Sequence, residues 1–299
     1  MTAFLTLIAI LVPASVTLTG YLFTHQSGKR LDQEREQENG RLKLDAAMRA
    51  ADLFGESVCG ANNAAKVASG LLALARLDFA DLAVAQLADF WHPQANPPPG
   101  AAESHGSCGV STETAIQVIN AALETGKPEP QLMAAELLCR NACKLDITDS
   151  LHWPSSVNST WIPELPVTAK LLIVDALVHM ALASKQTENA LRELAVRLYG
   201  VAMGDPEQRV QGCIGALMKA ILPAVGNLGY TDFMKGPGHG LVTLEQMEHV
   251  AAMASPHPDG YFEAITRDRC EKLAKWALGC AGAMSLTAGN LAPAGCALQ

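Results

Sequence analysis

Apolar residues recur every three or four positions along most of this chain, the spacing of one face of an α-helix. Polar residues, glycines and prolines separate these segments, and Ser111, Thr187 and Asp205 fit the N-cap position of the helices that follow them. The predicted helices are residues 64–76, 79–91, 112–125, 130–144, 166–184, 188–203, 206–226 with an interruption at Pro223, 244–254 and 261–282. No segment alternates convincingly between apolar and polar positions, so no strand is predicted. The pattern indicates an all-α protein built as an array of antiparallel helix pairs.

A glycine-rich stretch, KGPGHG at residues 235–240, precedes one of these helices. It matches neither the phosphate loop GxxxxGK[ST] nor the dinucleotide fingerprint GxGxxG. Thr243 and Gln246 have the spacing of a capping box, which predicts a tight turn that starts the next helix. His239 would lie just before that helix N-terminus, where backbone N–H groups could hold an anion. The turn is the favoured interpretation, and the anion site is the alternative.

The amino-terminal segment is apolar and carries no charge over residues 3–23. As a helix it would span about 30 Å, the thickness of a bilayer core, so residues 1–24 are predicted to form a transmembrane anchor. Basic residues follow the apolar run and none precedes it: Lys29, Arg30, Arg35, Arg41 and Lys43. The positive-inside rule then places the amino terminus outside the cell and the remaining chain in the cytoplasm.

The polar stretch at residues 25–41 is expected to be a charged juxtamembrane stalk, with a break near Asn39-Gly40. A helical domain is predicted over residues 42–282. Within it, the segment 92–110 is rich in proline and glycine and is expected to be a flexible surface loop. The tail at residues 283–299 has little apolar pattern and is expected to be disordered.

One helix resembles a known repeat. Residues 204–222, GDPEQRVQGCIGALMKAIL, are similar to the second helix of a HEAT repeat, with Asp205-Pro206 at the start and Val210 in the apolar run. Gln211 stands where the family often has arginine. The resemblance implies stacked helical hairpins, an α-solenoid, and a partner-binding surface, and it implies no chemistry.

Composition narrows the possible partners and cofactors. The net charge is −8 and no basic stripe is present, which argues against nucleic-acid binding. The eight cysteines are scattered without a CxxC motif and are interpreted as buried or free thiols. Cys139 and Cys143 share a helical face, but no second pair is spaced for zinc. No metal and no cofactor is therefore predicted.

Two pairs of a histidine and a carboxylate are the remaining candidates for a metal site or for acid–base catalysis. Glu245 and His249 share a helical face with His239 nearby, yet HExxH is absent. Asp175 and His179 share a face of the strongly apolar helix 167–183 and could do acid–base work, although a polar seam on a central helix is the favoured interpretation. No GxSxG elbow completes a triad, and no catalytic residue is assigned.

The same central helix predicts a set of core positions: Leu172, Val174, Leu177 and Val178. Two tryptophans, Trp153 and Trp161, lie in the irregular segment 145–165, which is expected to be packed. Each tryptophan would either anchor a partner or cover the core. Together with His239 they are the candidate binding residues.

These observations favour a single-pass membrane scaffold or adaptor that binds a protein partner at the cytoplasmic face of the membrane. One alternative is a helical enzyme or small-ligand-binding domain with a pocket near His239 and His249, or near Asp175 and His179. A second alternative is a structural or sensory membrane element. Fold alone does not identify a reaction, so the choice depends on the site.

Overall fold

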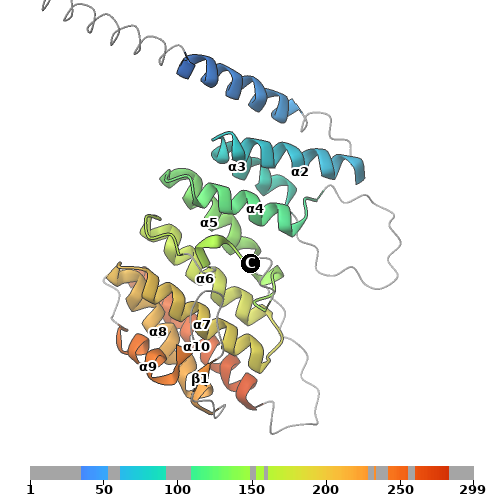
Figure 1. Cartoon of the computed structure of the whole chain (residues 1–299). Coiled ribbons are helices and arrows are strands. Elements are labelled where there is room, and N and C mark those ends of the chain that lie inside the picture. Colours follow the sequence, from blue (N-terminus) through green and yellow to red (C-terminus); the bar gives the residue numbers. More distant parts are fainter. Residues whose placement is uncertain are drawn as a thin grey trace, which may run out of the picture. The chain divides into compact units, whose positions relative to one another are not determined.

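The structure is a computed structural model, and it describes residues 35–52, 61–91, 109–148, 153–157, 161–227, 232–233, 242–254 and 260–282 (Figure 1). The chain divides into two units, Met1–Asp52 and Leu53–Gln299. The described part of the first unit is one helix that runs through Asn39 and Gly40, so the break predicted there is wrong. A single helical glycine costs only about 1 kcal/mol relative to alanine, which the helix formers around it can offset.

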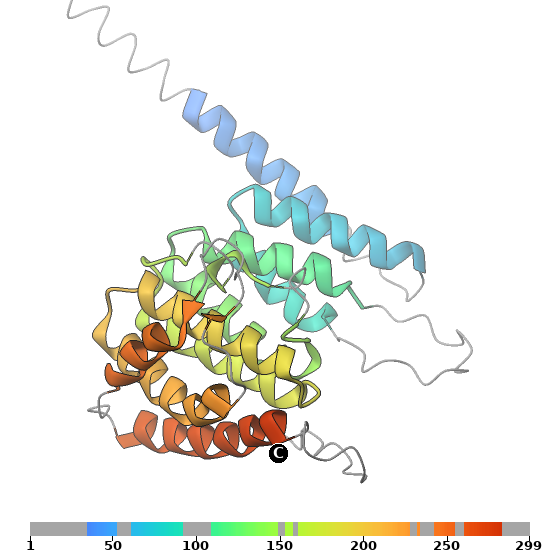
Figure 2. The ribbon, with the colours of Figure 1, turned by 60° about the horizontal axis from the view of Figure 1, so that its bottom comes forward.

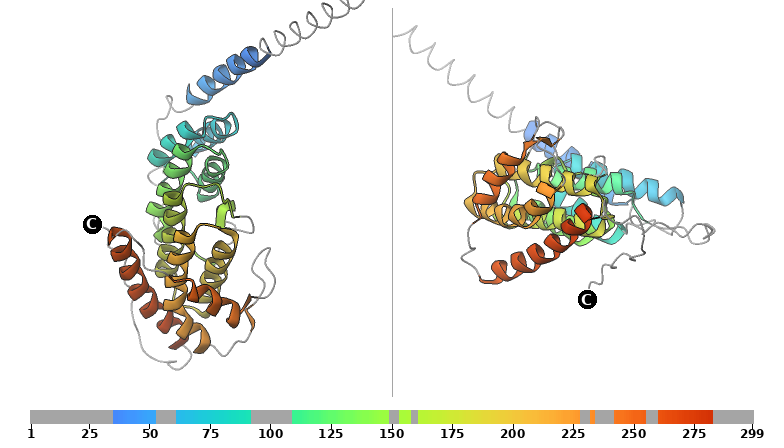
Figure 3. Two further views of the ribbon diagram at one scale, coloured as in Figure 1. Left: turned by 90° about the vertical axis from the view of Figure 1, so that its left-hand side faces the viewer. Right: turned by 90° about the horizontal axis from the view of Figure 1, so that it is seen from below.

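The second unit is built from helices that pack against their neighbours in sequence, which confirms the all-α prediction (Figures 1 and 2). Its α-helices are α2 Ala61–Arg76, α3 Ala80–Phe90, α4 Thr112–Leu123, α5 Pro128–Asn141, α6 Val167–Ala183, α7 Glu188–Gly204, α8 Gln208–Asn227, α9 Leu244–Ala252 and α10 Gly260–Gly282. Two short 3₁₀ turns, η1 Ala142–Lys144 and η3 Ser155–Val157, lie between α5 and α6. The long helix α10 packs across α8, with further contacts to α6 and α7 (Figure 3).

The starts of α4, α7 and α9 are set by side-chain caps. The hydroxyls of Ser111 and Thr187 each accept the backbone N–H three residues later, at 3.2 Å, as expected for N-caps. The predicted capping box at the start of α9 is also confirmed. Thr243 Oγ1 accepts the N–H of Gln246 at 3.3 Å, and the Gln246 side chain accepts the N–H of Thr243 at 2.8 Å.

The start of α8 differs from the prediction. This helix begins at Gln208, and the Asp205 carboxylate instead accepts the N–H of Glu207 at 2.8 Å in the turn before it. The helix also continues through Pro223, where an interruption was predicted. Pro223 lies in the last two turns on the exposed side, and buried apolar residues on the other side hold the helix in place.

A short β-hairpin precedes α9 and corrects the prediction that no strand is present. Strand β1, Asp232–Phe233, pairs antiparallel with β2, Val242–Thr243, so that Asp232 faces Thr243. Two-residue strands are too short to produce an alternating pattern in the sequence. The residues between the strands, with His239 and the glycines, lie outside the described residues, and the turn predicted there stays a prediction.

Helix α6 is central, since it contacts α5, α7, α8 and α10. Val174, Leu177 and Val178 are buried as predicted. Leu172 is only half-buried, contrary to the prediction, because it lies on the same face of α6 as Asp175 and His179. One face of α6 is therefore partly exposed to solvent, although the helix carries apolar residues on almost every side.

The described parts of segment 145–165 are packed as predicted. Their buried apolar side chains are Leu145, Ile147, Trp153, Val157 and Leu165. The tail 283–299, most of loop 92–110 and the predicted anchor at residues 3–23 fall outside the described residues. Within the described ranges, the helices lack the combination of length and apolar character that spanning a bilayer requires.

Candidate functional site

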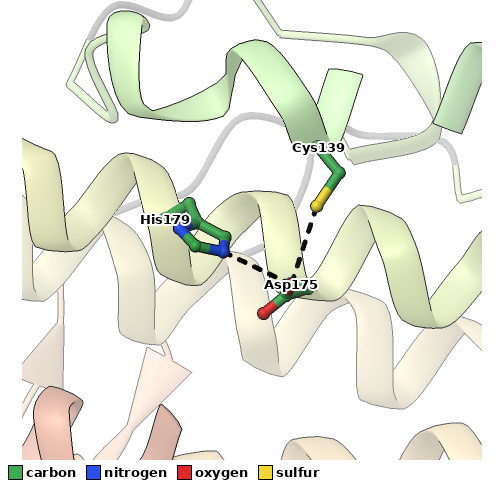
Figure 4. A group of neighbouring side chains, drawn as sticks. All are labelled: Cys139, Asp175 and His179. Atoms are coloured by element: carbon green, nitrogen blue, oxygen red, sulfur yellow. Dashed lines mark hydrogen bonds and ion pairs between the residues drawn. The ribbon is translucent and has the colours of Figure 1, made fainter. Parts of the chain in front are cut away.

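Three side chains with metal-type donor atoms converge between α5 and α6. Cys139 extends from the last turn of α5, and Asp175 and His179 extend from the middle of α6 (Figure 4). Cys139 Sγ donates to Asp175 Oδ2 at 3.6 Å, and His179 Nε2 lies 3.4 Å from the same oxygen. The donor atoms of all three residues lie within 4.8 Å of one another, and each side chain is half-buried.

The packing of two helices creates this cluster. Asp175 and His179 are four residues apart and therefore share a helical face, as the sequence indicated. Cys139 joins them because α5 packs along α6 with the C-terminal ends of both helices on the same side. In the sequence, Cys139 shares a predicted helical face only with Cys143, which lies in η1 in the structure.

A third helix, α10, contributes a cation. Arg269, on α10, donates from Nε to Asp175 Oδ1 at 2.8 Å. Its Nη1 lies 3.4 Å from Asp268 Oδ2, and Lys272 pairs with the same Asp268 oxygen at 2.9 Å. One oxygen of Asp175 is thus held by arginine, while the other faces the thiol and the imidazole. Sequence reasoning missed Arg269, since it has no distinguishing motif.

The pKa values of Cys139 and Asp175 are shifted in opposite directions. Burial raises the pKa of the Cys139 thiol to about 12, and the neighbouring Asp175 carboxylate adds to this effect. Burial would also raise the pKa of Asp175, but hydrogen bonds from His179 and Arg269 outweigh it and lower that pKa to about 2. The carboxylate is therefore ionised and the thiol protonated, an arrangement unsuited to nucleophilic catalysis by a thiolate.

Trp153, one of the predicted binding residues, is buried at 3% exposure. Its ring lies beneath the Arg197 guanidinium, 3.9 Å from the ring centroid. Arg197 in turn donates to the Val157 carbonyl at 3.0 Å and to the Glu193 carboxylate at 2.7 Å. These contacts join the packed segment before α6 to α7, and they place Trp153 in the core of the array.

Trp161, the second predicted tryptophan, is half-buried and belongs to a polar network. Its Nε1 donates to the Asp205 carboxylate, which also pairs with Lys170 Nζ at 2.9 Å. Lys170 is 4% exposed and the Asp205 side chain is fully buried. A Cβ on Gly204 would lie 3.0 Å from Trp161 Cβ, so the indole packs closely on the end of α7. The network ties the start of α6 to the turn after α7.

The Glu245–His249 pair on α9 lies apart from the cluster between α5 and α6. His249 and Glu245 are both exposed. His249 does not belong to the metal-type cluster found in the described part of the chain. His239 lies outside the described residues.

A pocket of about 370 Å³ lies close to the cluster. Cys143 and Ala183, one helical turn beyond Cys139 and His179, are part of its wall. The other lining residues come from the chain after α5, from the α6–α7 connection and from the first turn of α7: Lys144, Leu145, Asp146, Thr148, Ser184, Lys185, Thr187 and Ala190. The pocket therefore opens at the C-terminal ends of α5 and α6, beside the cluster.

No family model, no curated protein and no solved structure matches this chain. The class defined by the fold and the site is an all-α array with a Cys-Asp-His cluster at the α5–α6 contact.

Proposed function

We propose that this protein is a membrane-anchored scaffold whose HEAT-like helical array holds a protein partner at the cytoplasmic face of the membrane. The observation that carries this proposal is a set of exposed apolar side chains on two helices that pack against each other. Leu82 on α3 is 50% exposed, and Leu132 and Met133 on α5 are 38% and 37% exposed. Contiguous exposed apolar patches are typical of interaction sites, and these side chains lie on helices that contact each other.

Acidic residues flank these apolar positions. Asp81 and Asp89 lie on the exposed side of α3, and Glu129 lies on the exposed side of α5, where Glu136 is paired with Arg140. The whole chain is also acidic, with a net charge of −8. Charge complementarity therefore favours a partner segment that is an amphipathic helix with an apolar stripe and flanking lysines or arginines.

The apolar run at residues 3–23 and the basic residues after it support the membrane anchor and its orientation. The full-length chain should resist carbonate extraction from membranes. A reporter fused after Gln299 should be active only in the cytoplasm. Recovery of a soluble form that lacks residues 3–23 would contradict the anchor.

Site-specific photo-crosslinking tests the partner surface. A photoreactive residue at Leu82 in the full-length protein should crosslink, in native membranes, to a peptide with basic residues flanking an apolar helical stripe. The matched control is the same residue at Gln117, which is exposed on α4. Leu82→Asp should abolish capture through a second crosslinker at Met133, whereas Gln117→Asp should not.

Salt dependence provides a second test, because exposed charges are screened at high ionic strength. Crosslinking through Leu82 should fall as salt is raised. Equal crosslinking from Gln117, or a captured peptide without basic residues, would contradict the proposed surface.

A further inference from the structure

We propose that Cys139, Asp175 and His179 form a binding site for one divalent transition-metal ion of the zinc type, with a fourth coordination position open to an added ligand. No motif in the sequence indicates such a site, because its residues come from two helices. The proposal is independent of the partner surface on α3 and α5.

The donor set suits this class of ion. A thiolate, an imidazole nitrogen and a carboxylate oxygen are the three ligand types that zinc takes in proteins. Binding of the ion would release the proton of the Cys139 thiol to solvent, as metal binding to cysteine does. Calcium and magnesium prefer oxygen ligands and would not use a cysteine. Three protein ligands and one open position are typical of zinc sites that bind a water molecule or substrate.

The distances between donor atoms are close to those of a tetrahedral site. With ordinary zinc–ligand bond lengths, the sulfur–oxygen edge is about 3.5 Å and the nitrogen–oxygen edge about 3.3 Å. The corresponding distances here are 3.6 Å from Cys139 Sγ to Asp175 Oδ2 and 3.4 Å from His179 Nε2 to the same oxygen. The sulfur and the nitrogen lie within 4.8 Å of each other and need only a modest approach.

Arg269 holds the carboxylate in the orientation that the site needs. It occupies Oδ1 of Asp175 and leaves Oδ2 directed at the other two donors. Hydrogen bonds from outer groups orient metal ligands in this way in known sites. The repulsion between the arginine and a metal ion is reduced because Asp268 lies 3.4 Å from the guanidinium.

The backbone of the site is rigid, which favours a defined geometry. Asp175 and His179 are fixed relative to each other by one helix, at the i, i+4 spacing that also pairs histidines in helical zinc motifs. Cys139 is fixed by the packing of α5 on α6. An ion pair between Asp175 and Arg269 would by itself require neither the thiol nor the imidazole.

Cobalt(II) substitution tests the proposal. The purified full-length chain, first treated with a chelator, should bind one cobalt ion per chain at this site. The bound ion should show a thiolate-to-metal charge-transfer band and the intense visible bands of tetrahedral cobalt. Zinc should displace the cobalt and should raise the thermal midpoint of unfolding, since ligand binding to the folded state stabilises it.

Two conservative variants and two matched controls localise the ion. Cys139→Ser should lose the charge-transfer band. His179→Gln should weaken binding more than about 100-fold, since the loss of an outer-shell partner alone costs 10- to 100-fold. The control variants are Cys143→Ser, one turn from Cys139, and His249→Gln, on the exposed face of α9; both should bind like the wild type.

A charge-transfer band that survives Cys139→Ser, or unchanged affinity in His179→Gln, would overturn the proposal. If circular dichroism shows that either variant is unfolded, X-ray absorption of the zinc-loaded wild type identifies the metal ligands instead. One sulfur and one histidine nitrogen in the first shell are expected, and a shell without sulfur would contradict the site.

Discussion

Gly215 allows α8 to approach the end of α9 closely, and its replacement by alanine tests that contact. A Cβ at this position would lie 2.5 Å from the backbone nitrogen of Ala254 and 2.9 Å from its Cα. It would also lie 2.9 Å from the carbonyl oxygen of Val250. All three atoms belong to the backbone, so no side chain can rotate away to make room.

Two opposing effects determine the size of the change. Alanine is favoured over glycine inside a helix by about 1 kcal/mol. Overpacking costs about 1–3 kcal/mol, and a clash with backbone atoms belongs at the upper end of that range. We therefore expect Gly215→Ala to lower the free energy of unfolding by about 2 kcal/mol.

Chemical denaturation followed by far-ultraviolet circular dichroism measures this difference. Gly226→Ala is the matched control, because it lies in the same helix and the described residues leave open space around its Cβ position. It should be neutral or stabilise the protein by up to about 1 kcal/mol. Gly279→Ala should fall between the two, because the atoms nearest to its Cβ belong to the flexible side chain of Gln186. A Gly215→Ala protein as stable as the wild type would refute the close approach of α8 and α9.

Three further changes probe other contacts. Lys170→Ala should lower the free energy of unfolding by about 3–5 kcal/mol, because it leaves the buried Asp205 carboxylate without its cation. A loss below about 1 kcal/mol in a denaturant titration would show that the pair is not buried. Thr243→Ala should cost about 0.5–2 kcal/mol by removing an N-cap, and an unchanged midpoint of thermal unfolding would speak against the capping box. The pKa of Asp175 is lowered from 3.8 to about 2, so its stabilising effect is complete above pH 3.8 and is lost as the pH falls through about 2. The stability advantage of the wild type over Asp175→Asn should therefore shrink by about 2 kcal/mol across that interval, and a constant difference between the two proteins would contradict the shift.

Helices and their caps could be predicted because they depend on residues close together in the chain. The three- and four-residue spacing of apolar positions identified each helix of the second unit, and the Thr243–Gln246 box spans only one turn. The hairpin before α9 was missed because a strand of two residues has no measurable period. Leu172 was misassigned because α6 is apolar on almost every side, so periodicity alone could not identify its open face.

In the candidate site, too, the contacts between residues close in the chain could be predicted and the contacts between distant residues could not. Asp175 and His179 were found together in the sequence because one turn of a helix separates them. Cys139 lies 36 residues from Asp175, and Arg269 lies 94 residues from it. Which of the scattered cysteines and arginines reaches that carboxylate depends on how α5 and α10 pack against α6.

The sequence by itself determined the helical class, the helix pairs, the caps at Ser111, Thr187 and Thr243, and the local Asp175–His179 pair, because hydrogen bonding and periodicity act over a few residues. Only the tertiary structure decided which side chains meet between helices. It buried Trp153 beneath Arg197, paired Lys170 with Asp205, and directed Cys139 at Asp175. These contacts join residues far apart in the chain, and they form because close packing of the apolar faces sets the position of each helix against the next.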